Sequence, residues 1–391
     1  MLAMLILSQK LFLFTFQIKQ KLNYSALDNS KVFLYFITKN SQTNFGDYMK
    51  SQKLSFFSLF IFMVLANKVI YTYYFIPKLI NLYGNIAYLF PLLMIIVGVI
   101  AVLLLPKKFF MINYLSLIKK SRFLKYIYAS INYITAILFL LVSSHVLSNV
   151  FFEKYDYMLF LGSLFVVGIY IGLNENKLIV NSSTLLILVG LLSYIVPSFF
   201  NGAIKDYTLL KPMDTFNGDF YFLTLSYLLL DIISISMIAE KSLNNAKKWN
   251  LLIPIIFIFA FYSFDMFNLI LTTGISYLKD IEYLGFFILY VEDTVNYIGN
   301  FGLFYVYTIP LISLFRIGLS LSLVRNVLNI ESSFKFSIIL ILPILFIVYF
   351  IEKFLPVNSC TEIIVYLLLI LLSIVYLFII MNRSEKYEVK F

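Results

Sequence analysis

Four ionisable side chains stand inside otherwise apolar stretches of this chain: Lys68, Asp231, Asp265 and Arg316. Ionisable groups at membrane depth are costly, and they usually face a partner or a water-filled cavity. Lys68 lies too far from either end of its stretch for its amine to reach an interface easily. These residues are therefore the first candidates for binding chemistry. The chain shows no P-loop, dinucleotide, nucleophile-elbow or zinc motif, so we predict no catalytic residue, no metal, no cofactor and no enzyme.

Lys68 and Asp231 are predicted to lie at one ligand site. In transporters built from two inverted five-helix repeats, the site lies where the repeats meet, and helices 1 and 6 are symmetry mates there. Lys68 falls in the first apolar stretch and Asp231 in the sixth, so we expect them to pair or to flank one polar ligand. Tyr71 and Thr72 follow Lys68 where a discontinuous helix would open, and they complete the predicted ligand-binding set. The alternative is an ion pair that only holds two helices together.

For the remaining polar residues in the apolar stretches, the sequence predicts individual roles. Asn67 adjoins Lys68, and Asp265 lies within one turn of polar neighbours, a face that could line a water path or form a helix–helix contact. We expect Arg316 to reach toward the cytoplasm. The single histidine, His145, is expected to be an interfacial residue rather than a proton sensor.

The elements that must position these residues are apolar stretches of roughly 20 residues, long enough to cross a bilayer as helices. The chain is 61% hydrophobic and 13% charged, which excludes an ordinary soluble domain. We predict an all-α polytopic membrane protein with about ten transmembrane helices and a LeuT-like five-plus-five inverted repeat. The predicted spans are 55–75, 84–105, 124–148, 157–173, 178–200, 217–239, 250–276, 300–323, 335–354 and 361–381.

The basic residues between the stretches predict the orientation. With the N-terminus in the cytoplasm, 22 Lys and Arg fall in inside segments and six in outside segments. This bias predicts that both termini are cytoplasmic, because basic loops stay on that side. The net charge of +10 is then explained by topology and by contact with the lipid bilayer, and we predict no nucleic-acid partner.

The first 48 residues do not fit the pattern of the remainder. The apolar run 11–16 is too short to span a membrane, whereas Met49 directly precedes a short basic run and the first span. We therefore predict an N-terminal extension over 1–48, or a chain that starts at Met49, followed by one membrane domain over 49–391. Cys360 is the only cysteine, so no intramolecular disulfide forms.

Several short motifs occur in an order that resembles the spore germination permeases, the GerAB-type germinant-receptor subunits of the amino acid–polyamine–organocation superfamily. The likeness covers roughly 49–385. Near the start, it is carried by the polar segment Lys50-Ser51-Gln52-Lys53-Leu54 and by Phe75-Ile76-Pro77 with the stretch after it. In the middle of the chain, it is carried by Gly168 to Glu175 and by Leu209-Leu210-Lys211-Pro212-Met213. Asp231 then stands at the place of an acidic residue in helix 6, and Glu292-Asp293 stands before helix 8.

The resemblance implies a subunit in the inner (cytoplasmic) membrane of a spore-forming bacterium. It would bind a small nutrient, typically an amino acid, between spans 1, 3, 6 and 8. Its partners would be the A-type membrane subunit and the C-type lipoprotein of a germinant receptor. The chain departs from the family where Ile70 and Thr72 replace the Gly-x-Gly of helix 1, and where Leu229 replaces a helix 6 glycine.

Two other classes stay open. One is a proton- or cation-coupled amino-acid transporter of the same fold, in which Lys68 takes the place of a bound cation. The other is a membrane-bound polysaccharide polymerase or lipid-linked transferase, which also has many spans and few motifs. Such enzymes usually need a long polar outer loop, whereas the longest predicted outer loop, 277–299, is short and partly apolar.

Overall fold

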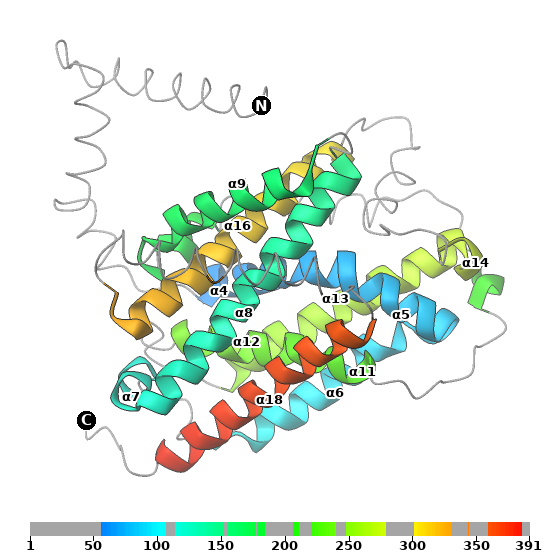
Figure 1. The fold of residues 1–391 in the computed structure, drawn as a ribbon. Coiled ribbons are helices and arrows are strands. Elements are labelled where there is room, and N and C mark those ends of the chain that lie inside the picture. Colours follow the sequence, from blue (N-terminus) through cyan, green and yellow to red (C-terminus); the bar gives the residue numbers. More distant parts are fainter. Residues whose placement is uncertain are drawn as a thin grey trace, which may run out of the picture. The chain divides into compact units, whose positions relative to one another are not determined.

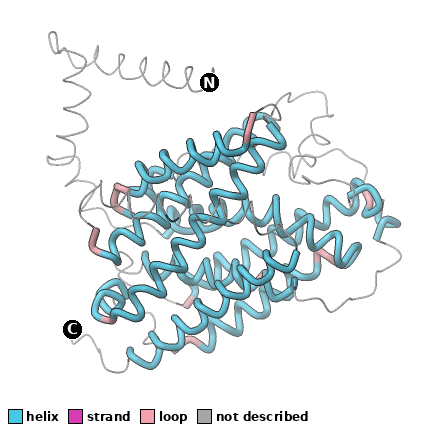
Figure 2. Tube along the Cα trace, in the orientation of Figure 1, coloured by secondary structure: helices cyan, strands magenta, loops and turns pink. Residues whose placement is uncertain are grey.

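The computed structural model describes residues 56–106, 114–151, 155–176, 178–183, 206–210, 221–239, 248–278, 301–330, 343 and 359–384. The chain divides into two units, Met1–Lys53 and Leu54–Phe391, and all described residues belong to the second. The predicted extension over 1–48 therefore lies outside the described residues. Every regular element in the described part of the chain is a helix, as Figure 2 shows.

The helices follow one another along the second unit (Figure 1). Their bounds are α4 Phe56–Ile70, η1 Tyr71–Phe75, α5 Ile76–Tyr83, η2 Gly84–Ile86, α6 Leu89–Leu104, α7 Tyr114–Lys120, α8 Arg122–Val146, η4 Leu147–Phe151, α9 Tyr157–Gly172, η5 Tyr207–Leu210, α11 Tyr221–Thr224, α12 Ser226–Ala239, α13 Trp249–Thr273, α14 Ile275–Leu278, α16 Phe301–Leu328 and α18 Ser359–Ser384.

Five of the described helical segments are long and apolar enough to cross a membrane. They are Phe57–Ile86, Arg122–Asn149, Trp249–Thr273, Leu311–Leu328 and Ile363–Asn382, and three shorter apolar helices accompany them, Leu89–Leu104, Tyr157–Gly172 and Ser226–Ile235. Together they coincide with eight of the predicted spans. The chain is therefore a helical membrane protein with several spans. Most of the predicted span 178–200 and almost all of 335–354 lie outside the described residues, so the ten-helix inverted repeat stays a prediction.

The first spanning segment continues past Pro77 instead of opening into two separate helices. The five residues of η1 form a π-helical turn between α4 and α5, and the Ile76 N–H donates to the Tyr71 carbonyl. Proline has no N–H to donate, so an α-helical ladder would lose a bond at this point. A wider turn just before Pro77 keeps the chain helical, and such π turns are frequent at functional sites.

The segment α4–η1 is the most enclosed part of the described bundle. Every residue from 61 to 73 is buried, and α4 contacts α8, α12, α13 and α16. By contrast, α18 exposes large apolar side chains such as Leu371 and Phe378, 62% and 64% exposed. A helix that is apolar on its exposed side faces lipid in a membrane protein. The polar side chains of α4 are therefore surrounded by protein.

Two glycine-lined helices pack closely at one side of the bundle. Gly168 and Gly172 are four residues apart on α9 and face Gly318 on α16, where added Cβ atoms would crowd Ile317, Leu321 and Ile171. Small residues at this spacing let two membrane helices approach closely. The packing holds α16, which carries Arg316, in a defined rotation.

Candidate functional site

Arg316 and Asp231 form a buried ion pair between α16 and α12. Nη2 of Arg316 donates to Oδ1 of Asp231, and the arginine is only 1% exposed. Nη1 donates to Ser320 Oγ at 2.9 Å, and the guanidinium lies 5.5 Å from the Phe139 ring centroid. The prediction that Arg316 reaches the cytoplasm is wrong, because a carboxylate on the neighbouring helix and a hydroxyl one turn away hold its side chain inside the bundle.

Lys68 pairs with Asp265, not with Asp231. Its Nζ lies 3.8 Å from Oδ2 of Asp265, between α4 and α13, and 4.7 Å from the Phe261 ring centroid. The predicted Lys68–Asp231 pair is wrong, since each acid meets a different base. Asp265 is enclosed in this helix–helix contact, and its side chain is 3% exposed. Each charge at membrane depth is thereby placed beside one of opposite sign, as the cost of burying it requires.

Tyr71 joins the two helices of the Lys68–Asp265 pair. Its ring stacks on Tyr262 of α13 with centroids 3.6 Å apart and planes at 10°. Its hydroxyl donates to Met266 Sδ at 2.9 Å and approaches the Tyr262 carbonyl at 3.3 Å. Tyr71 is the first residue of η1, so the π turn begins where α4 is attached to α13.

Several buried polar atoms around the two pairs have no hydrogen-bond partner in the described part of the chain. They are Asn67 Oδ1, Thr72 Oγ1, Asp231 Oδ2, Arg316 Nε and Tyr262 OH. The Asn67 amide does donate to the Met63 carbonyl at 3.3 Å, which fixes its other end. Nearly all buried polar atoms in proteins are hydrogen-bonded, and leaving one unsatisfied costs about 1–3 kcal/mol. These atoms mark the surroundings of the two ion pairs as the polar part of the bundle.

The site therefore comprises α4, η1, α12, α13 and α16. Lys68, Tyr71, Thr72 and Asp231, which we predicted as ligand-binding, are all buried there. The additional candidates Asn67, Asp265 and Arg316 are buried there too, and with Lys68 and Asp231 they supply two positive and two negative charges. A neutral molecule carrying charges of both signs would match this balance, because it could exchange partners with either pair.

Sequence reasoning missed Tyr262, Ser320 and Phe139, which belong to the surroundings of the buried charges. Tyr262 lies three residues before Asp265, and Ser320 lies four residues after Arg316, so each is on the same helical face as a buried charge. This spacing in the sequence could have identified both residues as neighbours of a buried charge. Phe139, on another helix, had no such indication.

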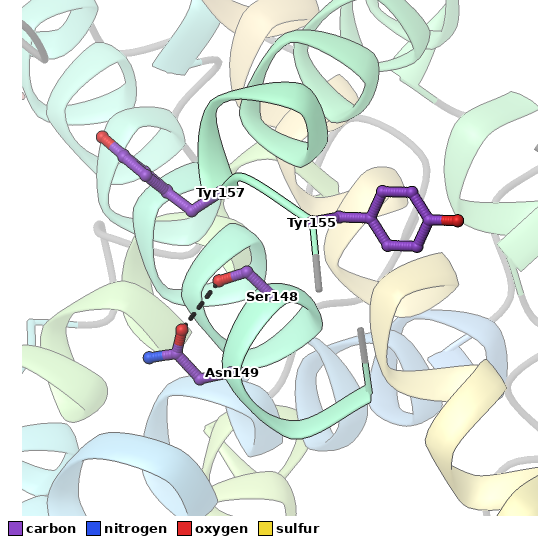
Figure 3. A pocket seen from close by; sticks show the side chains of 4 residues that line it. All are labelled: Ser148, Asn149, Tyr155 and Tyr157. Atoms are coloured by element: carbon purple, nitrogen blue, oxygen red, sulfur yellow. Dashed lines mark hydrogen bonds between the residues drawn. The ribbon is translucent and has the colours of Figure 1, made fainter. Parts of the chain in front are cut away.

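A separate open pocket lies at the end of α8 and is drawn in Figure 3. Ser148, Asn149, Tyr155 and Tyr157 line its volume of about 320 Å³. Ser148 Oγ donates to Asn149 Oδ1 at 2.9 Å. His145 is exposed beside it, and its ring stacks on Tyr157 with centroids 4.6 Å apart. The lining carries no charge and includes none of the buried ion-pair residues.

At the opposite end of α8, polar contacts join α9 and α16. Ser322 Oγ donates to the Asn174 carbonyl at 2.8 Å and lies 2.7 Å from Asn176 Oδ1, the alternative acceptor of its one hydrogen. Arg325 donates to the Leu173 carbonyl. These bonds satisfy carbonyls at the C-terminus of α9, where helical partners end. They support the helix that carries Arg316.

Comparison with known proteins adds no relative to this description: no protein-family model and no curated protein matches the chain. The fold and the site define a helical membrane protein with several spans and two charge pairs buried in its bundle.

Proposed function

We propose that this chain is the membrane subunit of a germinant receptor, which binds a small nutrient inside a ten-helix bundle and so helps to trigger spore germination. The ligand class is an amino acid, whose ammonium and carboxylate groups complement the acids and bases of the site. The single observation that carries the proposal is the burial of two ion pairs and five unsatisfied polar atoms on the neighbouring elements α4, η1, α12, α13 and α16. The germinant-receptor class itself is supported by the sequence resemblance.

The contact between Lys68 and Asp265 supports a way in which a ligand would act on the bundle. The Lys68–Asp265 contact at 3.8 Å is longer than a charge-assisted hydrogen bond, which is typically about 2.7–2.9 Å. A ligand carboxylate could take Lys68, and the released Asp265 could take the ammonium group. Because η1 begins three residues after Lys68, such an exchange would bear on the π turn between α4 and α5. A ligand shifts a two-state bundle only by its difference in affinity for the two states.

Germination of spores tests this proposal. Spores that lack the gene are scored nutrient by nutrient and then complemented with wild type, with Lys68→Met, or with Glu175→Gln as a control at an exposed position. The proposal predicts loss of response to one or a few amino acids, with normal response to non-nutrient triggers. Wild type and the control restore the response, whereas Lys68→Met present at normal level in the membrane does not. Unchanged germination of the deletion strain for every nutrient would contradict the proposal.

A second candidate is an amino-acid transporter of the same fold. The observation that favours it is the buried Lys68 ammonium, a fixed cation inside the bundle that could stand in for a coupling ion. Uptake of labelled amino acids by proteoliposomes that contain only this chain would favour transport. A response that requires co-expressed A-type and C-type subunits would favour the sensor.

A further inference from the structure

The corner between α7 and α8 gathers basic side chains at one end of a membrane-spanning segment. Lys119 and Lys120 end α7, Arg122 begins α8, and all three are exposed. Only Ser121 separates the two helices. We call Lys119, Lys120 and Arg122 the basic corner.

The sequence around this corner is basic over a long stretch. Between Asp47 and Glu153 the chain contains no Asp or Glu at all, while Lys107, Lys108 and Lys125 add to the positive charge. Lys125 is directed elsewhere, since its Nζ approaches the Leu328 carbonyl at the end of α16 at 3.5 Å. This stretch of the chain therefore has a net positive charge, which favours an anionic partner at the corner.

Exposed aromatic residues continue the same side of α8 into the span. Phe123 and Tyr126 are 59% and 63% exposed, whereas Leu124 beside them is fully buried. The segment from Arg122 to Asn149 is apolar enough to cross the membrane, so its first turn lies at a membrane surface. Aromatic side chains are enriched at that level of a bilayer.

The arrangement places exposed basic side chains next to exposed aromatic ones, which is the order of headgroup and acyl chain in a phospholipid. A phosphate headgroup would meet the basic corner, while the glycerol region and the upper acyl chain would lie along Phe123 and Tyr126. The Ser121 side chain makes no capping hydrogen bond to α8, so the first N–H groups of that helix also favour an anion. Short α7 is fixed in place by the buried side chains of Leu117 and Ile118, which orients the two lysines.

We propose that the basic corner, with Phe123 and Tyr126, is a binding site for an anionic phospholipid such as phosphatidylglycerol. The site is independent of the buried charge pairs and of the proposed nutrient ligand. A soluble nucleic acid or acidic protein is disfavoured as the occupant, because the exposed aromatics lead into the apolar face of a spanning helix.

Lipid binding to the full-length protein tests the proposal. The protein is purified in detergent, and binding of phosphatidylglycerol and of phosphatidylcholine with matched acyl chains is followed by native mass spectrometry and by titration. Each Lys or Arg near an anionic surface contributes about 1 kcal/mol, so we expect Lys119→Gln/Lys120→Gln/Arg122→Gln to lose on the order of a hundredfold in affinity for phosphatidylglycerol. The matched control, Lys119→Arg/Lys120→Arg/Arg122→Lys, keeps the charge and the binding.

The outcomes separate the proposal from its alternatives. Equal affinity for the two lipids, or full binding by the glutamine variant, would overturn it. Competition by inorganic phosphate as strong as by the lipid would identify a free-anion site instead, and competition by RNA a nucleic-acid surface. If the glutamine variant fails to fold, the salt dependence of lipid binding to the wild type still tests the proposal. Added salt should weaken the binding of phosphatidylglycerol and leave the binding of phosphatidylcholine unchanged. Binding of phosphatidylglycerol that does not respond to salt would overturn the proposal.

Discussion

Removal of one partner of the Arg316–Asp231 pair should destabilise the protein strongly and asymmetrically. Breaking a buried ion pair costs about 3–5 kcal/mol, because the remaining charge stays buried without its counterion. Both side chains are almost fully buried, at 1% and 6% exposed, so little solvent is available to compensate. We expect Asp231→Asn to reach the upper part of that range.

Removal of the arginine instead of the aspartate should lower the free energy of unfolding by less. A carboxylate left without its partner can take up a proton and become neutral, whereas a guanidinium stays charged. Arg316→Met should therefore destabilise less than Asp231→Asn, even though it also removes the hydrogen bond to Ser320 and the contact with Phe139. Replacing both members together, as Asp231→Leu/Arg316→Met, should be close to neutral, because well-packed apolar groups often replace a buried pair without loss.

Reversible unfolding in mixed lipid–detergent micelles measures these effects as free energies of unfolding. The exposed Glu175→Gln is the control and should change the free energy by less than about 0.5 kcal/mol. Two results would refute the reasoning. One is a cost below about 1 kcal/mol for Asp231→Asn, which is the range of exposed ion pairs. The other is a double variant whose loss equals the sum of the two single losses.

Three further changes test other parts of the structure by the same unfolding assay. Gly318→Ala should cost about 1–3 kcal/mol because its Cβ would overlap Ile171, and little change would show that α9 and α16 are looser. Gly274→Ala should cost about 1–3 kcal/mol, because φ 75° and ψ 151° suit only glycine; an unchanged midpoint contradicts that geometry. Hydrogen bonds from Thr208 lower the pKa of Asp206, so the stability they add is present at neutral pH and is lost as the pH falls through that lowered pKa; Asp206→Asn should remove this part of the pH dependence.

The helices and the buried charges could be predicted from the sequence because both depend on local composition. A run of about 20 apolar residues must be helical in a membrane, and a charge within it must be enclosed. The structure accordingly has helices at eight predicted spans, with Lys68, Asp231, Asp265 and Arg316 all buried.

The pairing of those charges could not be predicted in the same way. Which base meets which acid depends on the rotation and the neighbours of each helix, and these follow from packing such as that of Gly318 on α9. We predicted the pair of Lys68 and Asp231 from the assumption that helices 1 and 6 share one ligand site. In the structure, α13 lies beside Lys68 and α16 lies beside Asp231. The continuation of the first helix through Pro77 was missed for a related reason, since a π turn depends on the backbone hydrogen bonds that remain available.

Binding of labelled amino acids to the purified full-length protein in lipid nanodiscs tests the central claim most directly. The account predicts saturable binding of one or a few amino acids to the wild type and to Glu175→Gln. It predicts a large loss of binding in Lys68→Met and in Asp265→Asn variants that retain the wild-type elution profile on gel filtration. Binding that is unchanged in both variants, or no binding of any amino acid to the wild type, would contradict the claim that the buried charges hold the ligand.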